Sequence, residues 1–300
     1  MTREVAVLKG AFTPLVTPFR NGAVDYDLYS KIIDWQIDQG AQGLLVNATS
    51  GEPTTLTSEE KAQLIEVAVK ASAGRRPVLA GIPAESHAEA VTLLARAEKA
   101  RADAVVSVTP YYTRPPQRGL IAFFDDLAAR TELPFLVYHI PGRAAVSVTA
   151  ETFEQIAERR PNFVGLKNTD DDLALVSRLI SRLGPNFRIF GGLESTAFAM
   201  CTLGGCGTMI MTSNVAPKQI ARLNDLCVAG RLREAQKLVI ELDELMAAPF
   251  LDTGPIPVKC MMKLMGLTLT NEHRLPMVPA TPELERQLEG VVERYCLSVR

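Results

Sequence analysis

The feature that most constrains the fold of this 300-residue chain is a regular alternation of two kinds of segment. Short runs of apolar and β-branched residues alternate with longer segments in which apolar residues recur with helical periodicity. The runs lie at residues 10–19, 43–49, 77–83, 104–110, 134–141, 163–169, 187–193 and 207–212. Continuous apolarity is typical of parallel strands that helices cover on both faces. The sequence therefore predicts eight βα units.

The segments between the runs carry signals for the start of a helix. Asp25 precedes the first segment, Ser58 begins the segment 58–72, and Thr149 precedes a later one. Side chains of this kind cap the free N–H groups of a first helical turn. Each segment is long enough for a helical crossover between parallel strands. Eight such units in about 220 residues fit a (β/α)8 TIM barrel.

The main alternative is a doubly wound sheet, which would be expected to carry a glycine-rich phosphate loop after its first strand. The sequence there, TPFRNGAVD, lacks the G-x-G-x-x-G pattern, so the barrel is favoured. After the eighth unit the pattern changes to consecutive helical segments with no strand between them. We therefore expect a barrel that carries the active site over residues 1–224, and a C-terminal helical domain over residues 225–300.

Composition and spacing exclude several classes of function. The formal net charge is −2, with no run of basic residues, so neither nucleic acid nor a membrane is expected as a partner. No apolar run approaches 18 residues and the N-terminus lacks a signal-peptide pattern, so we expect a cytoplasmic protein. The five cysteines and three histidines form no metal-binding pattern. We accordingly expect small-molecule substrates and no metal or other cofactor.

Polar residues follow several of the predicted strands. In a TIM barrel the chemistry takes place at the carboxyl ends of the strands, where the side chains converge on one mouth. Reading only those ends of the sequence gives a short set: Asn47 to Glu52, Tyr111 and Tyr112, Tyr138 to Arg143, Lys167 to Thr169, and Glu194. The set contains hydroxyls, a lysine and an arginine, and no evident group of metal ligands.

Lys167 is the least expected member of this set, because it ends the apolar stretch 163–166. A lysine at the end of a strand ordinarily extends its ammonium into water. At a desolvated barrel mouth, burial disfavours the ammonium, and a neutral amine can form a Schiff base with a carbonyl substrate. Tyr138, on the adjacent strand, would be placed to shuttle protons, although a buried tyrosine is more often a core residue. The pairing of the two residues favours a catalytic role.

Six segments spread over nearly the whole chain carry motifs that occur together. They are GAFTPLVTPF, NATSGEPTTLT, VTPYYTRPPQRGL, VYHIPGR, VGLKNTDDDL and the tail GPIPVK to RLPMVP. Together they resemble the pyruvate-dependent class I aldolases of the dihydrodipicolinate synthase/N-acetylneuraminate lyase family, and the synthases within it most closely. The Y-x-x-P-G-R and G-x-K motifs at this spacing are specific for that family.

The resemblance implies four catalytic residues. Lys167 would form the Schiff base with pyruvate, and Tyr138 would relay protons. Thr49 and Tyr112 would complete a chain of hydroxyls, with Tyr112 reaching the site of a neighbouring subunit. The resemblance therefore also implies a homo-oligomer, either a dimer or a tetramer.

The resemblance further implies how the substrates are bound. Thr49, Ser50 and the backbone near Met209 would hold the carboxylate of pyruvate. Arg143 would bind the carboxylate of the second substrate, aspartate semialdehyde. The implied product is 4-hydroxy-tetrahydrodipicolinate, the first committed intermediate of lysine and diaminopimelate biosynthesis.

The chain departs from the common pattern of the family at a few positions. These are Ala48, Ser50, His139, Ala144 and the pair Leu193–Glu194. We expect those near the fifth and seventh strands to line the pocket for the second substrate. A rival hypothesis therefore keeps the Schiff base but makes the protein a lyase or dehydratase of another 2-oxo acid. Arg143 favours the synthase, because a guanidinium pairs with the carboxylate of an aldehyde acid, whereas the neutral polyol chain of a sugar-derived substrate has no such group.

A third hypothesis is a non-catalytic sensor of 2-oxo acids built on the same barrel. Such a sensor would be expected to lose Lys167 or Tyr138. The chain retains both residues, so an enzyme is favoured.

Overall fold

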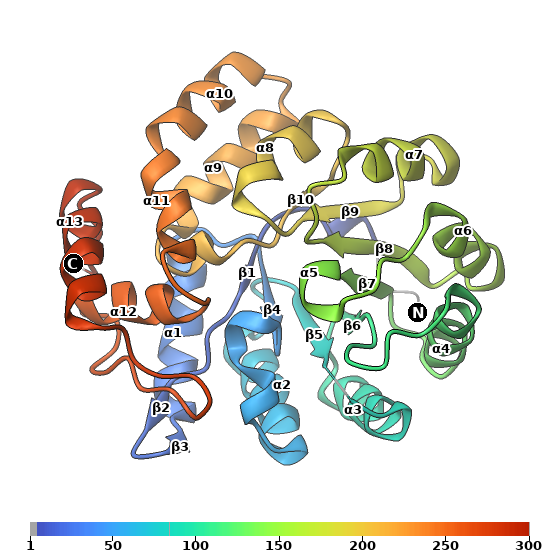
Figure 1. The fold of residues 1–300 in the computed structure, drawn as a ribbon, viewed down its shortest axis with the longest axis horizontal. Coiled ribbons are helices and arrows are strands. Elements are labelled where there is room, and N and C mark those ends of the chain that lie inside the picture. Colours follow the sequence, from blue (N-terminus) through green and yellow to red (C-terminus); the bar gives the residue numbers. More distant parts are fainter. Residues whose placement is uncertain (1–4, 84, 300) are drawn as a thin grey trace.

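Eight parallel strands form a closed barrel at the centre of the protein (Figure 1), and the computed structural model describes residues 5–83 and 85–299. The strands pair in the order β1-β10-β9-β8-β7-β6-β5-β4, and β4 pairs with β1 to close the ring. They are β1 (Gly10–Pro14), β4 (Gly43–Val46), β5 (Val78–Ile82), β6 (Ala104–Val108), β7 (Phe135–His139), β8 (Phe163–Asn168), β9 (Arg188–Gly191) and β10 (Gly207–Thr208). Each lies within one of the eight predicted runs, so the (β/α)8 TIM barrel is confirmed.

Helices surround the barrel and connect its strands (Figure 1). They are α1 (Tyr26–Asp38), α2 (Ser58–Ser72), α3 (His87–Ala100), α4 (Gln117–Ala129), α6 (Ala150–Arg159), α7 (Leu173–Leu183), α8 (Glu194–Thr202) and α9 (Pro217–Val228). Asp25 and Thr149 cap α1 and α6 as predicted, while the N-cap of α2 is Thr57, in a capping box with Glu60. No helix in the described part of the chain is both long and apolar enough to span a bilayer.

A short hairpin that was not predicted follows β1. Its strands are β2 (Phe19–Arg20) and β3 (Ala23–Val24), which pair antiparallel. Asn21 and Gly22 between them have φ of 53° and 78°, the left-handed conformation of a two-residue hairpin turn. The first predicted run, residues 10–19, therefore covers both a barrel strand and the start of this hairpin.

The chain after β10 is helical, as predicted. Beyond α9 lie α10 (Leu232–Glu241), α11 (Asp243–Ala247), α12 (Ile256–Leu264) and α13 (Pro282–Arg294). Helix α9 packs against β1 and α8 and continues through residue 224 to Val228. The division into a barrel over 1–224 and a C-terminal domain over 225–300 stays a prediction.

Apolar side chains fill the barrel below its mouth. Phe12, Leu79, Leu136 and Phe190 are buried in one interior cluster that also contains Tyr138. A second, larger cluster lies between the strands and the helices. Because interior packing stops near the carboxyl ends of the strands, the polar residues there can converge on a cavity.

Candidate functional site

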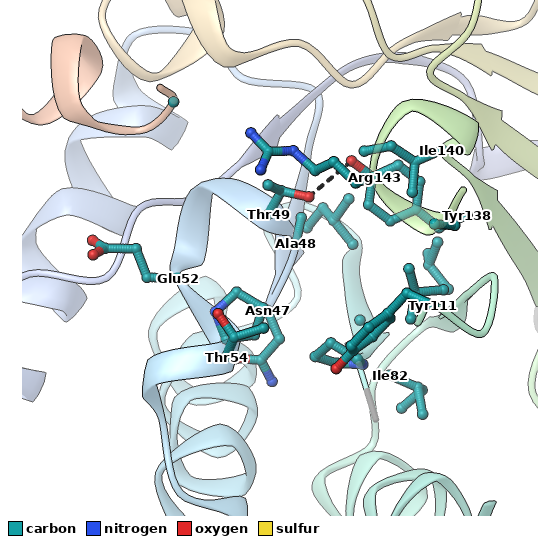
Figure 2. Close-up of a pocket in the computed structure, with 18 of the residues that line it drawn as sticks. Asn47, Ala48, Thr49, Glu52, Thr54, Ile82, Tyr111, Tyr138, Ile140 and Arg143 are labelled. Atoms are coloured by element: carbon teal, nitrogen blue, oxygen red, sulfur yellow. Dashed lines mark hydrogen bonds between the residues drawn. The ribbon is translucent and has the colours of Figure 1, made fainter. Parts of the chain in front are cut away.

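Two adjoining cavities, of about 250 and 690 Å³, lie at the carboxyl ends of the strands. Figure 2 shows residues that line the first of them. Five residues line both: Thr49, Tyr138, Ile140, Arg143 and Gly254. Lys167 lines the second cavity together with Ser50 and Met209. The structure therefore brings six of the seven predicted site residues to one mouth.

Lys167 is 3% exposed, so its ammonium does not extend into bulk water. It pairs in register with Tyr138 across β7 and β8, and its Nζ lies 4.1 Å from the centroid of the Tyr138 ring. Gly192 makes room for it, because a Cβ at that position would collide with Thr169 and lie 3.0 Å from Lys167 Cε. The local packing therefore directs the amine into the cavity.

Three lysines are buried in the described part of the chain, and their partners differ. Lys61 Nζ lies 2.9 Å from Glu89 Oε1, and Lys259 Nζ lies 2.7 Å from Glu52 Oε1. No described carboxylate lies within 4.0 Å of Lys167 Nζ. A buried ammonium is ordinarily paired. Lys167 is therefore the buried lysine whose amine is left available to a substrate.

Tyr138 has a phenol suited to proton transfer. Its Oη lies 3.1 Å from Thr49 Oγ1, the contact drawn as a dashed line in Figure 2. Burial raises the pKa of Tyr138, but the positive charge of Lys167 and the hydrogen bond with Thr49 outweigh it, so the pKa lies below its ordinary value. A phenol whose pKa is closer to neutral gives and takes protons more readily at physiological pH.

Thr49 and Ser50 lie on the 3-10 turn η2 (Thr49–Gly51), which follows β4. The Ser50 hydroxyl donates to Pro14 O at 2.6 Å, and the Gly51 carbonyl accepts from Thr17 Oγ1 at 2.7 Å. These bonds fix the turn against the end of β1. Because the hydroxyl hydrogen of Ser50 is already donated, its side chain as placed here does not donate to a substrate carboxylate, and the role that the resemblance implies would fall to other donors of the turn.

Met209 is buried just after β10. Its N–H donates to Gly191 O at 2.7 Å, so this donor is not free for a substrate carboxylate. Other backbone groups of the same stretch would have to take the role that the resemblance implies.

Arg143 lies on the short helix α5 (Pro141–Ala144) and lines both cavities. The residue is exposed, and its guanidinium forms no salt bridge with any described carboxylate. Arg143 is therefore not the partner in a structural ion pair among the described residues. Its position suits a ligand carboxylate, which a guanidinium binds with two parallel hydrogen bonds.

Tyr112 is the predicted residue that the structure does not bring to this site. Its side chain is 93% exposed and it lines neither cavity. The preceding Tyr111 lines the first cavity instead, and burial raises its pKa to about 12. Tyr112 has φ of 67°, so the chain turns there and the two neighbouring tyrosines point in different directions. A role for Tyr112 in a neighbouring subunit stays a prediction.

His139 lines neither cavity, so the expectation that it lines the pocket for the second substrate was wrong. It follows Tyr138 on β7 and therefore points to the opposite, outer side of the strand. Its Nδ1 lies 2.8 Å from Asn168 Oδ1, and its Nε2 accepts from the Val148 N–H at 3.2 Å. Burial lowers its pKa, which agrees with a neutral ring that donates at one nitrogen and accepts at the other.

Glu194 is likewise outside both cavities, so the expectation was wrong for this residue too. It is buried at the start of α8, where its Oε1 accepts from the N–H and the hydroxyl of Thr212, both at 3.0 Å. Burial raises the pKa of its carboxyl. Ala144 lines the first cavity and Leu193 the second, as expected of these departures.

The C-terminal part of the chain contributes walls that sequence reasoning missed. Gly254 and Pro255 line the first cavity, and Phe250, Asp252 and Thr253 line the second. The GPIPVK motif could have indicated these walls, because it is one of the six segments that carry the family resemblance and it lies beyond the last predicted strand. The site is therefore built by the barrel and by the segment after α11 together.

Comparisons with known proteins agree with this architecture. The model of the dihydrodipicolinate synthetase family matches residues 7–295. The 4-hydroxy-tetrahydrodipicolinate synthase of Oleidesulfovibrio alaskensis is 39% identical over 283 residues, which cover 94% of this chain and 97% of that protein. The crystal structure of dihydrodipicolinate synthase from Aquifex aeolicus has a TM-score of 0.94 at 35% identity, covering 96% of this chain and 98% of that one.

A third similar structure was determined with a ligand. It is the chloride-inhibited dihydrodipicolinate synthase from Acinetobacter baumannii complexed with pyruvate. Its TM-score is 0.93 at 32% identity, with 97% of this chain and 99% of that chain covered. Matches of this length and identity leave one conclusion. The chain belongs to the dihydrodipicolinate synthetase family and is a lyase of the class I aldolase type.

Proposed function

We propose that the protein has 4-hydroxy-tetrahydrodipicolinate synthase activity and condenses pyruvate with aspartate semialdehyde. The observation that carries the proposal is the buried Lys167 amine, which has no described carboxylate partner and faces the Tyr138 phenol. A class I aldolase needs a free amine and a proton shuttle beside it. The names of the similar proteins and the pyruvate complex among them support the same substrates.

The proposed chemistry begins at the pyruvate carbonyl. Lys167 Nζ attacks C2 and water leaves, giving an imine on the enzyme. Loss of a proton from C3, relayed through Tyr138 and Thr49, gives an enamine. The enamine carbon attacks the aldehyde of the second substrate, whose oxygen takes up a proton. The amino group of that substrate then displaces Lys167 from C2, which closes the ring and frees the lysine.

A second candidate function is a Schiff-base lyase or dehydratase acting on another 2-oxo acid. Leu193 supports it, because it lines the larger cavity at a position where the chain departs from the common pattern of the family. Arg143, which lines both cavities without a described ion partner, favours the synthase. We therefore place the synthase first. Its proposed role is in lysine and diaminopimelate biosynthesis, and the proposed location is the cytoplasm, as expected from the sequence.

Replacing Arg143 with alanine tests the second substrate. Loss of a charge-assisted pair weakens a complex by roughly 1.5–3 kcal/mol, so KM for aspartate semialdehyde should rise by about one to two powers of ten. Imine formation with pyruvate should persist, since Arg143 is not needed for it. Steady-state kinetics with each substrate varied, together with borohydride trapping of pyruvate, measures both effects.

Two further variants control this experiment. Arg143→Lys should recover only part of the affinity, because an ammonium cannot reproduce the planar guanidinium fork. Arg114 donates to Ala145 O beside α5 and lines neither cavity, so Arg114→Ala should leave KM unchanged. Unchanged KM in Arg143→Ala, or no turnover of this aldehyde by the wild type, would favour the lyase or dehydratase.

We also propose a homo-oligomer in which Tyr112 completes the site of a neighbouring subunit. The proposal is supported by the 93% exposure of Tyr112 and by its left-handed backbone, with φ of 67°, since an exposed tyrosine held in a strained conformation suggests a partner. Tyr112→Phe should lower kcat by about tenfold or more if its hydroxyl relays protons. Sedimentation at assay concentration together with kinetics tests this: a fully active monomer would remove the role of Tyr112.

A further inference from the structure

A buried cluster of charged residues lies behind the turn that carries Thr49. The Glu52 side chain is 1% exposed, and both of its carboxylate oxygens have partners. Oε1 lies 2.7 Å from Lys259 Nζ, and Oε2 lies 2.9 Å from His273 Nδ1. Because a carboxylate can only accept, the hydrogen in the second bond lies on Nδ1. None of the three residues takes a direct part in the proposed reaction, so the cluster requires another explanation.

The three residues come from distant parts of the chain. Glu52 follows β4, Lys259 lies on α12, and His273 lies in the segment between α12 and α13. Figure 2 shows the Glu52 carboxylate pointing away from Thr49 and Tyr138. Glu52 lines the edge of the first cavity, but its carboxylate is directed toward the C-terminal segment, so the cluster connects that segment to the turn.

The backbone of Glu52 ends the turn η2. Its N–H donates to Thr49 O at 3.1 Å, and its carbonyl accepts from the N–H and hydroxyl of Thr55. Its φ of 53° places it in the left-handed region, which is unfavourable for a residue with a long side chain. Contacts of the side chain must therefore hold this conformation, and the bonds with Lys259 and His273 are suited to do so.

Stability alone does not explain the cluster. Burying charged groups is unfavourable, and buried ion pairs can often be replaced by apolar residues without loss of stability. Burial lowers the pKa of Lys259, and the attraction of Glu52 only partly offsets this effect. The Nε2 of His273 is buried without a partner among the described residues. A network of this kind is better explained by the conformation that it specifies.

We propose that Glu52, Lys259 and His273 are positioning residues, through which the C-terminal segment holds η2 so that Thr49 meets Tyr138. The geometry is a relay of contacts: the cluster fixes the Glu52 backbone, and that backbone fixes the turn. The hydroxyl of Thr49 then lies 3.1 Å from Tyr138 Oη. The kinetic part of this inference rests on the proposed reaction, while its structural part does not.

The flanking residues supply matched controls. Glu272 precedes His273 and accepts from the N–H groups of Asn21 and Gly22, so it holds the same segment without touching Glu52. Lys263 lies one turn after Lys259 on α12 and pairs with Glu285 at 2.7 Å. Glu272→Gln and Lys263→Met therefore alter the same elements but remove none of the hydrogen bonds among Glu52, Lys259 and His273.

The test compares Glu52→Gln and the double variant Glu52→Gln/Lys259→Met with these controls. Glu52→Gln should lower kcat by about tenfold or more, since a displacement of 1 Å near reacting groups can cost about 10²-fold. It should also lower Tm, because Lys259 is left buried without its counter-ion. The double variant should regain Tm but keep the low kcat. The controls should retain wild-type kcat.

Crystal structures of the same variants provide a readout that does not depend on the reaction. In both cluster variants the Thr49 Oγ1 to Tyr138 Oη distance should exceed that of a hydrogen bond, and in both controls it should be unchanged. Recovery of both Tm and kcat in the double variant, or an unchanged distance, would overturn the proposal. Failure of the wild type to trap pyruvate would instead overturn the proposed function, and the distances would still decide this inference.

Discussion

Lys167→Met is expected to abolish the attachment of pyruvate to the protein by borohydride and to lower kcat by at least about 10³-fold. The reason is that Nζ of Lys167 supplies the covalent bond on which the whole reaction depends, while methionine preserves the length and packing of the side chain. Intact-protein mass spectrometry of the wild type should show one added reduced pyruvyl group per chain, and peptide mapping should place it on Lys167.

The other buried lysines provide internal controls for that experiment. Lys61 and Lys259 are buried like Lys167, but each is paired with a carboxylate and lines neither cavity. Both should remain unmodified, because a paired ammonium does not add to a carbonyl. Chelators should leave the wild-type activity unchanged, since the imine serves as the electron sink. A pyruvyl adduct on the Lys167→Met protein would show that the amine lies elsewhere.

The barrel could be predicted because its strands are covered on both faces. Such strands appear in the sequence as uninterrupted apolar runs, and each of the eight runs contains one strand of the barrel. The ends of the strands could not be predicted in the same way, because apolar residues continue in the sequence beyond the last hydrogen bond of the barrel. The run at residues 10–19 hid the hairpin β2–β3, although the Asn21–Gly22 pair is a strong hairpin signal. Turn chemistry, rather than hydrophobicity, marks where that strand ends.

The site could be predicted where residues lie in register on neighbouring strands. Tyr138 and Lys167 face the same cavity because β7 pairs with β8 at those positions. The prediction for His139 was wrong because His139 directly follows Tyr138 on β7, and successive side chains of a strand point to opposite faces. Glu52 and Lys259, which form a salt bridge, are 207 residues apart in the sequence. No local sequence pattern indicates that these two charged residues pair. Contacts of this kind require the fold itself.

Tyr138→Phe is expected to lower kcat by about 10²–10⁴-fold, the usual effect of removing a group that transfers protons. Lys167 should still accept pyruvate in borohydride trapping, more slowly than in the wild type, because its amine is retained. The wild-type kcat should show a pH limb from the Tyr138 phenol, whose pKa is held below its ordinary value by Lys167 and Thr49 against the effect of burial. That limb should be absent in Tyr138→Phe.

Thr49→Val isolates one cause of the lowered pKa. Valine has the shape of threonine but cannot form the 3.1 Å hydrogen bond with Tyr138 Oη, so the pKa of Tyr138 should rise and the limb should move to higher pH. Tyr29→Phe is the matched control, since Tyr29 is fully buried in the outer apolar cluster and lines neither cavity, and it should leave the pH profile unchanged. A limb that stays at its wild-type pH in Thr49→Val, or survives in Tyr138→Phe, would assign the proton transfer to another group and leave Tyr138 as a packing residue beside Lys167.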